Sequence, residues 1–543
     1  MSDSNFLEKN ISILSTKNQN LAKQILNAGT QKSVYTGTMT AKNGMSVVSL
    51  ANSKPMYSLY NPTPKSQPVD FTRTFYLVGG LGNGYHFLSL LENSENHVLI
   101  VEKNADSIKF LFLCYDFSQI LSKPNFDICT TDSLEEKLLA TYIPQICGIF
   151  KYLSNRVWAE NCIETEKTIN QLIRSSLQKI RADYSVQAHF GKIWLRNIME
   201  NLYIFSKQKK NNSITIPNHK TAAIIAAGPT LDSTIKILKN KQDDYYIIAT
   251  DTASQVLFLN NIKPDAIVSV DGQNISYRHF LKTNIIPHTL YILDLCANAS
   301  ISRAVVKSNG TLRFVSGTHP LCKLASDFFK TKNNTTALPF LDSTSGTVTG
   351  AALDYAIKAG FNKIELFGAD FAYSYGKPYS RGSYLDETFN NSSSRIGTQE
   401  TAFSALMFRT PLIPLDNSKT TTETLQQYNR AITIAAEKSY AHIAKISADM
   451  KFQNFKTLKN GFNKQDQFDF FTETLYNPSK FADFITWILK SISEARGKPQ
   501  SDILTVLLPF AAWCEKKGYY QSSKDSFDRI LDLAQDFFKR YAE

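Results

Sequence analysis

The order of apolar and polar positions indicates alternating strands and helices in the middle of the chain. Six short apolar runs predict strands, at 222–227, 245–250, 265–270, 290–295, 311–315 and 363–370. Helical stretches separate the first three, and the helical run GAALDYAIKAG, with Gly360 at the C-cap position, precedes the last. This alternation predicts a mostly parallel sheet with helices on both faces. Ligands of such sheets bind beyond the carboxyl ends of the strands.

The pattern differs before and after this region. A helix is predicted from Asn10 to Leu26. From Thr74 an apolar strand, a glycine turn, a helix of about ten residues and a second strand form one βαβ unit. Long helices are predicted over 134–207, and the segment 460–543 has helical patterns and no strand.

A polar, proline-containing stretch near 207–220 gives the best boundary between these regions. The predicted fold class is α/β, with a central Rossmann-like domain, a Rossmann-like βαβ domain before it and a helical C-terminal region. The predicted domains are a lead-in over 1–70, the βαβ domain with its helical connector over 71–215, the central domain over 216–415 and the helical domain over 416–543.

Composition narrows the class of protein. The chain has 543 residues, of which 43% are hydrophobic, 12% aromatic and 20% charged, as in globular proteins. Its start has polar and acidic residues in place of a signal peptide, and no apolar run reaches about 18 residues. We therefore expect a cytoplasmic protein without membrane insertion.

The net charge and the cysteine content indicate no particular binding or catalytic site. The net charge of +12 is dispersed, which favours a solvated basic surface over a nucleic-acid site. The seven cysteines are scattered and form no CxxC pair, so we interpret them as reduced core residues and predict no metal site of cysteines and histidines.

Candidate site residues gather at predicted strand ends. The first central strand ends at Gly228-Pro229-Thr230, where a glycine allows close approach of a phosphate to the N-terminus of the next helix. An ordinary turn between a strand and a helix is the alternative. Asp251, Asp271 and Asp294 end the next three strands, and together they favour a site for a ribose, a sugar hydroxyl or a divalent cation over three separate helix caps.

Three later segments add candidates. His319 lies in the turn SGTHP, and SGTVTG, with Ser345, Gly346 and Thr347, places hydroxyls and glycines just before a helix, as in a phosphate cradle. The Tyr- and Gly-rich loop 368–384 contains Lys377 and Arg381. These two cations would offset the charge of a phosphate, although a mobile surface loop is the alternative.

The order of the motifs GPTL, DTA, IKPD, VSVD, SGTVTG and GADFAY over about 200 residues resembles the DUF115, MptE-like domain of motility-associated (Maf) flagellin glycosyltransferases. MYSLYNPTPKS at 56–66 and the GGLGNGYHF unit are similar to the N-terminal part of the same proteins. This resemblance implies a transferase that moves a nonulosonic acid, of the pseudaminic or legionaminic type, from a CMP-activated donor to Ser or Thr of flagellin in support of motility.

The central domain is also similar in outline to bacterial sialyltransferases. That similarity implies that the CMP nucleotide contacts the turn Gly228, Pro229, Thr230 and the helix start Ser345, Gly346, Thr347. It further implies that Asp370 and the tyrosines after it hold the phosphate, with Tyr373, Tyr375 and Tyr379 as the candidates.

The sequence departs from the sialyltransferases where catalysis is concerned. Ala227 and Asp251 replace two asparagines, and after Asp370 the next histidine is His442, too far along to match their general base. The catalytic candidates are therefore Asp251, Asp271 and His319, with His279 as a further choice. Alternatively Asp271 holds Mg²⁺, as in a pterin pyrophosphokinase of the MptE type.

Two other functions remain open. GGLGNG (79–84), with Glu102 about 20 residues later, also fits a dinucleotide or S-adenosylmethionine turn, and hence a methyltransferase, although we favour a structural role for this unit. A non-catalytic flagellin-binding protein is the other alternative. In either case the expected docking surface for flagellin is the C-terminal helical region from about 416 onward, with the aromatic residues Phe468, Phe470, Phe471, Trp487 and Trp513.

Overall fold

The computed structural model divides into two compact units, each of which is described by itself. The structure describes residues 4–63, 72–208, 217, 220–280, 285–286, 288–330, 338–439, 441–446, 452–454, 479–498 and 501–542. The first unit comprises 1–191 and 507–534, and the second comprises 192–506 and 535–543. The fold is α/β with a helical C-terminal region, as predicted.

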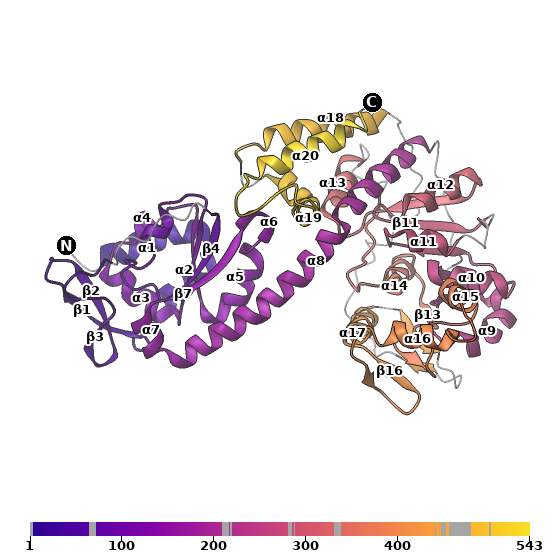
Figure 1. Cartoon of the computed structure of the whole chain (residues 1–543), viewed down its shortest axis with the longest axis horizontal. Helices are drawn as coiled ribbons and strands as arrows, with labels where there is room; N and C mark the ends of the chain where they lie inside the picture. Colours follow the sequence, from indigo (N-terminus) through magenta and orange to yellow (C-terminus); the bar gives the residue numbers. More distant parts are fainter. Residues whose placement is uncertain are drawn as a thin grey trace. The chain divides into compact units, whose positions relative to one another are not determined.

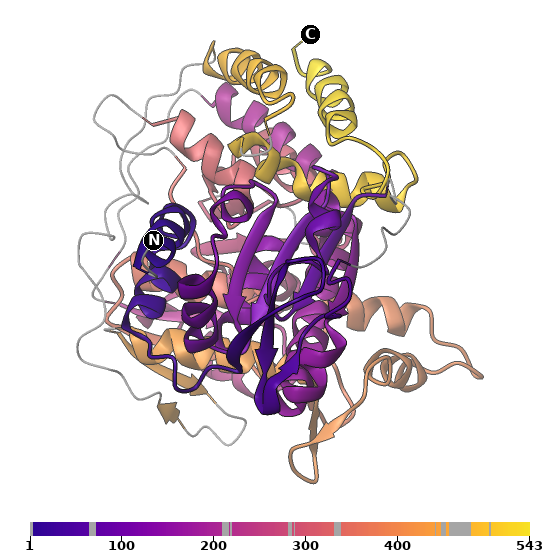
Figure 2. The same cartoon turned by 90° about the vertical axis from the view of Figure 1, so that its left-hand side faces the viewer.

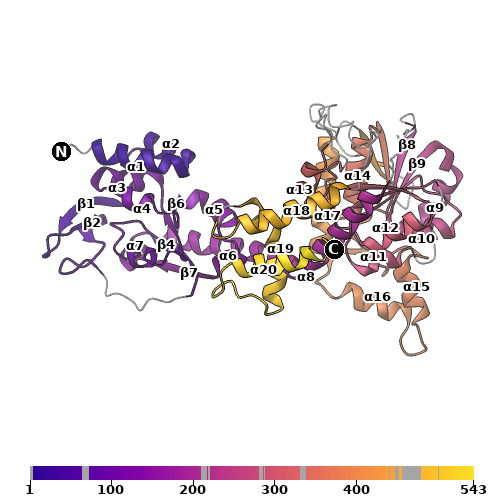
Figure 3. The same ribbon diagram turned by 90° about the horizontal axis from the view of Figure 1, so that it is seen from above.

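The first unit opens with two helices and a small antiparallel sheet. The elements are α1 Ser4–Lys17, α2 Gln19–Asn27, β1 Tyr35–Thr40, β2 Ser46–Leu50 and β3 Lys54–Pro55. The single predicted helix from Asn10 to Leu26 is divided because the Asn18 side chain accepts a hydrogen bond from Leu21 N–H and caps α2. Seen from above in Figure 3, α1 and α2 lie beside α3.

A four-stranded parallel sheet forms the core of the first unit, with strand order β6-β5-β4-β7 (Figure 2). Its elements are β4 Thr74–Gly79, β5 His97–Glu102, α3 Ala105–Cys114, α4 Ser118–Leu121, β6 Phe126–Thr130, α5 Leu134–Thr141, α6 Pro144–Cys147, β7 Ile149–Ser154 and α7 Arg156–Asn161. Every residue of β4 is buried, as expected of a central strand covered on both faces.

Two predictions for this unit are wrong. The connection between β4 and β5 contains turns and one short 3₁₀ helix, Leu88–Leu91, in place of the predicted ten-residue helix. The glycines at 80, 82 and 84 have positive φ, which interrupts a helix. The predicted helical stretch after 134 includes strand β7, because Ile149–Ser154 pairs with β4 along its whole length.

Helix α8, Ile163–Lys207, confirms the long helix predicted before residue 207, and it runs in sequence from the first unit into the second. The chain returns to the first unit after 506 through α19, Asp502–Lys516, and the start of α20, Asp528–Lys539. Arg73 anchors this return by donating hydrogen bonds to the carbonyl oxygens of Ser522 and Asp525.

The second unit contains an eight-stranded sheet in the order β12-β11-β10-β9-β8-β13-β17-β18, in which only the β18 pairing is antiparallel (Figure 1). The strands are β8 Thr221–Ile225, β9 Tyr245–Thr250, β10 Ala266–Ser269, β11 Leu290–Asp294, β12 Thr311–Val315, β13 Lys363–Phe367, β17 His442–Ile446 and β18 Phe452–Asn454. The six predicted central strands are confirmed.

Helices cover both faces of this sheet. They are α9 Leu231–Asn240, α10 Asp251–Leu259, α11 Asn274–Arg278, α12 Ala299–Lys307, α13 Pro320–Phe328, α14 Val348–Lys358 and α17 Glu423–Lys438. The inward side chains of α14 and α17 share one core with alternate residues of the strands, such as Ile224 and Ile248, while α9 and α10 lie on the opposite face. Because helices cover both faces of the sheet, nearly every residue along these strands is apolar.

The sheet of the predicted central domain continues beyond residue 415, because β17 pairs with β13. The predicted domain limits themselves stay predictions. Between β13 and β17 the chain forms a small three-stranded sheet and two helices, with β14 Tyr373–Ser374, β15 Ile413–Pro414, β16 Lys419–Thr421, α15 Tyr384–Asn391 and α16 Gln399–Met407.

In the C-terminal region, helix α18 is Ser479–Glu494. Its Trp487 packs against Phe328 and Phe484, and Trp513 stacks on Phe510, so both rings contribute to packing within their own unit. Phe468, Phe470 and Phe471 of the predicted docking surface lie outside the described residues. In the part of the chain that the structure describes, no helix is long and apolar enough to cross a membrane.

Candidate functional site

The strand order reverses between β8 and β13, and the turns that follow these two strands touch. Gly228 N–H donates to the Gly368 carbonyl at 2.9 Å, and the carboxylate of Asp370 accepts from Thr230 N–H at 2.8 Å and from the Thr230 hydroxyl. In open α/β sheets this reversal is where ligands bind. The motifs GPTL and GADFAY, 140 residues apart, therefore meet at the expected place.

The two glycines here are required by the protein itself. A Cβ atom on Gly228 would lie 2.4 Å from the Gly368 carbonyl oxygen and 2.5 Å from a carboxylate oxygen of Asp370. Gly368 has a φ of +61°, and a Cβ atom added to it would lie about as close to the Ala226 carbonyl oxygen. The Asp370 carboxylate accepts a hydrogen bond from Thr230 N–H at the start of α9. The sequence predicted a phosphate at this position. The predicted anion position at Thr230 is thus filled by a carboxylate of the chain.

Asp251 is a buried carboxylate at the end of β9. Only 1% of the residue is exposed; one carboxylate oxygen accepts from Ser269 Oγ at 2.7 Å and the other from Thr252 N–H at 2.7 Å. Burial raises the pKa of Asp251 to about 7, and the nearby Asp271 charge adds to the rise while these two hydrogen bonds oppose it. A carboxylate with a pKa near neutrality can accept a proton from a hydroxyl at physiological pH.

The loop after β13 brings tyrosines to the same carboxylate. Burial raises the pKa of Tyr379, and the charges of Tyr373 and Asp251 add to this rise. The loop is held in place because Ser380 N–H donates to the Ala227 carbonyl at 2.9 Å and Arg381 N–H donates to the Asp232 carboxylate at 2.8 Å. Tyr379 therefore lies in the electrostatic environment of both Asp251 and Tyr373.

Tyr375 is placed differently. It is 76% exposed, has a φ of +51° and donates its N–H to the Ser418 carbonyl. No hydrogen bond among the described residues joins its side chain to the Asp251 region. The structure therefore brings two of the three predicted tyrosines together.

A lysine that sequence reasoning missed lies at the same reversal. Lys445 is near the end of β17, where its ammonium donates to the Asp370 carbonyl at 3.3 Å and lies 5.2 Å from the centre of the Phe371 ring. Burial lowers the pKa of Lys445 to about 8, and the Asp370 charge opposes the decrease. The available signal was the alternating run HIAKI after a helix, which falls beyond the predicted end of the central domain.

Asp271 follows β10 in a loop that α8 holds. Asn197 on α8 donates to the carbonyls of Gly272 and Cys296 at 3.0 and 3.1 Å, and Asn201 donates to those of Leu295 and Ala297 at 2.9 and 2.8 Å. Both asparagines are buried. The helix thus fixes the loops after β10 and β11.

Next to this loop lies a polar cavity of about 280 Å³, whose lining includes Arg196, Asn274, Asn298 and Arg303. Asn298 links the cavity to the loop, because its N–H donates to the Asp271 carbonyl at 3.1 Å. Glu200 also lines the cavity, and its carboxylate pairs with Arg303 at 2.8 Å. Arg196 is therefore the lining cation that suits a carboxylate or a phosphate.

The predicted cradle Ser345-Gly346-Thr347 forms the N-terminus of α14. The Thr347 hydroxyl caps the helix by accepting from Gly350 N–H at 3.0 Å, and Gly346, with a φ of +74°, lies against the ring of Tyr428. Ser345 lines a cavity of about 350 Å³ between α14 and α17. Among the described residues, no hydrogen bond joins this segment to the Gly228 turn.

The two histidine candidates are both buried. His319 Nδ1 accepts from Leu321 N–H at 3.1 Å and so caps α13, and its ring meets Trp194 edge-on. His279 meets Tyr384 edge-on, and its Nδ1 has no hydrogen-bond partner among the described residues. Burial lowers the pKa of each to about 4, so both rings are neutral at physiological pH.

The central part of the chain is similar to proteins of a known family. Residues 195–376 match the family described as 6-hydroxymethylpterin diphosphokinase MptE-like. An uncharacterized protein of Treponema pallidum (strain Nichols) is 34% identical over 240 residues, which are 41% of this chain and 78% of that protein. A second one from the same organism is 36% identical over 151 residues, 27% of this chain and 70% of that protein.

The chain belongs to the MptE-like family. A Maf glycosyltransferase from Magnetospirillum magneticum AMB-1 is similar in structure, with a TM-score of 0.56 and 13% sequence identity, over 100% of this chain and 97% of that one. At this identity the likeness concerns the fold. The MptE-like domain of the chain contains the strand ends that carry Asp251 and Asp271, the Gly228 turn and the first part of the tyrosine loop, whereas Tyr379 and Lys445 lie beyond it.

Outside the MptE-like domain, the GGLGNG turn of the first unit is filled by protein. The Glu102 carboxylate accepts four hydrogen bonds, from Leu81 N–H, Tyr35 OH, Lys103 N–H and Trp158 Nε1–H, at 2.9, 2.7, 2.9 and 3.1 Å. These four bonds use all the acceptor positions of a carboxylate. A Cβ on Gly80 would strike the Trp158 ring at 2.7 Å. Glu102 therefore holds the turn and has no free acceptor for a ribose hydroxyl.

Proposed function

We propose that the chain is a cytoplasmic glycosyltransferase that moves a nonulosonic acid from a CMP-activated donor to Ser or Thr of flagellin. The observation that carries this proposal is the position of Asp251. It is a buried carboxylate with a pKa of about 7 at a strand end next to the reversal of strand order, in the electrostatic environment of Tyr379. A proton acceptor beside a nucleotide position is what glycosyl transfer to a hydroxyl requires.

In this proposal the acceptor hydroxyl gives its proton to Asp251 while its oxygen attacks the anomeric carbon of the donor and CMP leaves. The phosphate of CMP gains negative charge as the bond breaks. Lys445 and the hydroxyls of Tyr373 and Tyr379 are the groups that stabilise this charge. Because only 1% of Asp251 is exposed, we expect the loop 375–383 to move when substrates bind.

Two further features support an acidic sugar donor. The cavity beside Asp271 contains Arg196, which suits the carboxylate of a nonulosonic acid, while its second arginine, Arg303, is paired with Glu200. The family named by the domain match handles phosphorylated substrates by its description, and the fold is shared with a Maf glycosyltransferase. A nucleotide-linked anionic donor is consistent with both.

The intact mass of flagellin tests the proposal in the cell. In a strain that lacks this protein we expect flagellin to lose the mass of its added sugars and the cells to move poorly. Restoring the wild-type chain should restore the mass, whereas the Asp251→Asn chain should not. Flagellin that keeps its full glycosylated mass in the deletion strain would show that this protein is not the required transferase.

A further inference from the structure

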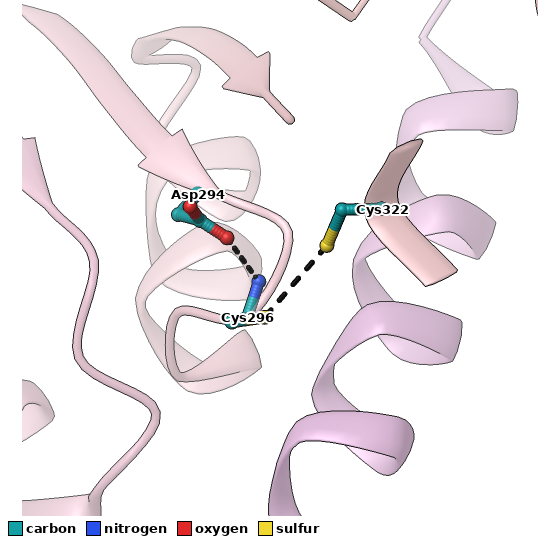
Figure 4. A group of neighbouring side chains, drawn as sticks. All are labelled: Asp294, Cys296 and Cys322. Atoms are coloured by element: carbon teal, nitrogen blue, oxygen red, sulfur yellow. Dashed lines mark hydrogen bonds between the residues drawn. The ribbon is translucent and has the colours of Figure 1, made fainter. Parts of the chain in front are cut away.

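One cluster of metal-ligating side chains lies outside the residues used above. Asp294 ends β11, Cys296 follows it, and Cys322 is in the first turn of α13. Figure 4 shows the three side chains directed toward one another from these two segments. All three residues are buried, and their ligand atoms lie within 4.8 Å of one another. In a triangle of this size, one point lies within about 2.8 Å of every corner, close to the bond lengths of zinc.

The distance between the two sulfur atoms fits shared coordination. Cys296 Sγ and Cys322 Sγ are 3.7 Å apart. Two zinc–sulfur bonds of about 2.3 Å at a tetrahedral angle place the sulfurs about 3.8 Å apart. A disulfide would bring them to about 2.05 Å. The two cysteines therefore have the spacing of a pair of ligands, although two packed thiols have a similar contact distance.

The charge of Asp294 also favours a bound cation. Among the described residues, no ion pair involves Asp294, which is 3% exposed. One carboxylate oxygen of Asp294 accepts a hydrogen bond from Cys296 N–H at 2.7 Å. A buried carboxylate without a cation is costly, and a bound divalent ion would remove that cost.

The position of Cys322 suits a metal-bound thiolate. Cys322 lies in the first turn of α13, where the positive end of the helix dipole stabilises negative charge. Gly317 leaves space beside the cluster, because a Cβ there would lie 1.9 Å from Asp294 Oδ2.

We propose that Asp294, Cys296 and Cys322 bind one Zn²⁺ ion. Two thiolates with one carboxylate form a donor set that suits zinc better than magnesium or calcium, which prefer oxygen ligands. Binding releases the two thiol protons, and the fourth tetrahedral position is left for a water molecule. The ion would tie the end of β11 to the start of α13. This inference is independent of the proposed transferase activity.

Metal content of the purified full-length chain tests the site. The protein is expressed with added Zn²⁺, passed over a weak chelating resin, and its zinc is measured by mass spectrometry. We expect about one zinc per chain, and less than about a fifth of that in Cys296→Ala and in Cys322→Ala. Cys129→Ala is the matched control, because Cys129 is equally buried but lies on β6 of the first unit, and it should keep its zinc.

Two further measurements keep the test decisive if an alanine variant fails to fold. Co²⁺ added to the metal-free wild-type chain should give the intense sulfur-to-metal absorption of a thiolate complex, and this band should weaken in Asp294→Asn. A wild-type chain that holds no zinc after this treatment and gives no such band would overturn the proposal. A Cys296–Cys322 disulfide in the peptide map of freshly purified protein would overturn it as well.

Discussion

At the scale of single residues, the site depends on where the chain places charge out of water. Asp251 has two hydrogen-bond donors and no cation within ion-pair distance among the described residues, so burial dominates its pKa. Asp370, by contrast, is stabilised by Thr230 and accepts its bonds at the start of a helix. The carboxylates at the ends of β9 and β13, the two strands that flank β8, therefore have different chemistry. Asp251 is suited to accept a proton, and Asp370 is suited to hold structure.

We expect transfer activity to rise with pH through about 7 and then to level off, because Asp251 must lose its proton to act as a base. Asp251→Asn should lower the transfer rate by about 10²–10⁴-fold and abolish the rise. The measurement is the pH profile of transfer to flagellin by both chains. A variant with the wild-type rate and profile would remove Asp251 from catalysis.

Asp251→Asn should also change how the stability of the protein depends on pH. The folded-state pKa of Asp251, about 7, lies above the ordinary aspartate value of about 3.9, so its contribution to native stability falls as pH rises from about 4 to about 7 and is constant above. Asp251→Asn removes this dependence. Its melting temperature relative to the wild-type chain should therefore increase between pH 5 and pH 8.

Gly228→Ala tests the close contact between the two turns. The added Cβ would lie 2.4 Å from the Gly368 carbonyl oxygen, so we expect the second unit to lose about 1–3 kcal/mol of unfolding free energy, with or without nucleotide. Gly397→Ala is the control, because its Cβ would meet no atom closer than 3.6 Å and its φ is not positive. Equal stability of the two variants in urea unfolding would contradict the described contact.

At the scale of elements, periodicity predicted the strands that are buried on both faces and missed those with mixed exposure. The six central strands read as apolar runs because helices cover both faces of their sheet. Strand β7 was missed because Ile149–Ser154 alternates partly exposed residues and follows a helical segment. Strand β17 was missed for a similar reason, although its pairing with β13 brings Lys445 to the site.

Replacement of Lys445 should weaken CMP binding without lowering the stability of the protein. Burial depresses its folded-state pKa to about 8, so the charged side chain costs stability at pH 7, and Lys445→Met should fold at least as stably as the wild-type chain. Loss of a charged hydrogen bond to the phosphate should weaken CMP binding about tenfold. Calorimetric titration measures both chains, with Lys236→Met, an exposed lysine of α9, as the control. Unchanged CMP affinity in Lys445→Met would exclude a phosphate contact.

At the scale of the whole molecule, domain limits could not be predicted from local patterns. Helix α8 contributes residues to both units. Residues 507–534 belong to the first unit although they follow most of the second unit in the sequence. Such assignments depend on contacts between distant residues, such as Arg73 with Ser522, that no local period reveals. The same limit applies to the site, because strand ends were identifiable from the sequence, but the pairing of Thr230 with Asp370 was not.

The two glycine-rich turns of the molecule also show why a motif is not a site. GPTL lies where the strand order reverses, next to Asp251 and Lys445. GGLGNG lies against Trp158, and its acidic partner Glu102 has all its acceptor positions filled. Of these two turns, GPTL is thus the one at a reversal of strand order, although Asp370 takes its Thr230 N–H.

The most direct test of this account is the ligand that stabilises the intact protein. Melting temperatures of the full-length wild-type chain are measured with CMP, CTP, S-adenosylmethionine or NAD, since a ligand that binds the native state raises the free energy of unfolding with the logarithm of its concentration over its dissociation constant. We predict that CMP and CTP raise the melting temperature and that S-adenosylmethionine and NAD leave it unchanged. Stabilisation by S-adenosylmethionine or NAD without any by CMP would contradict the central claim.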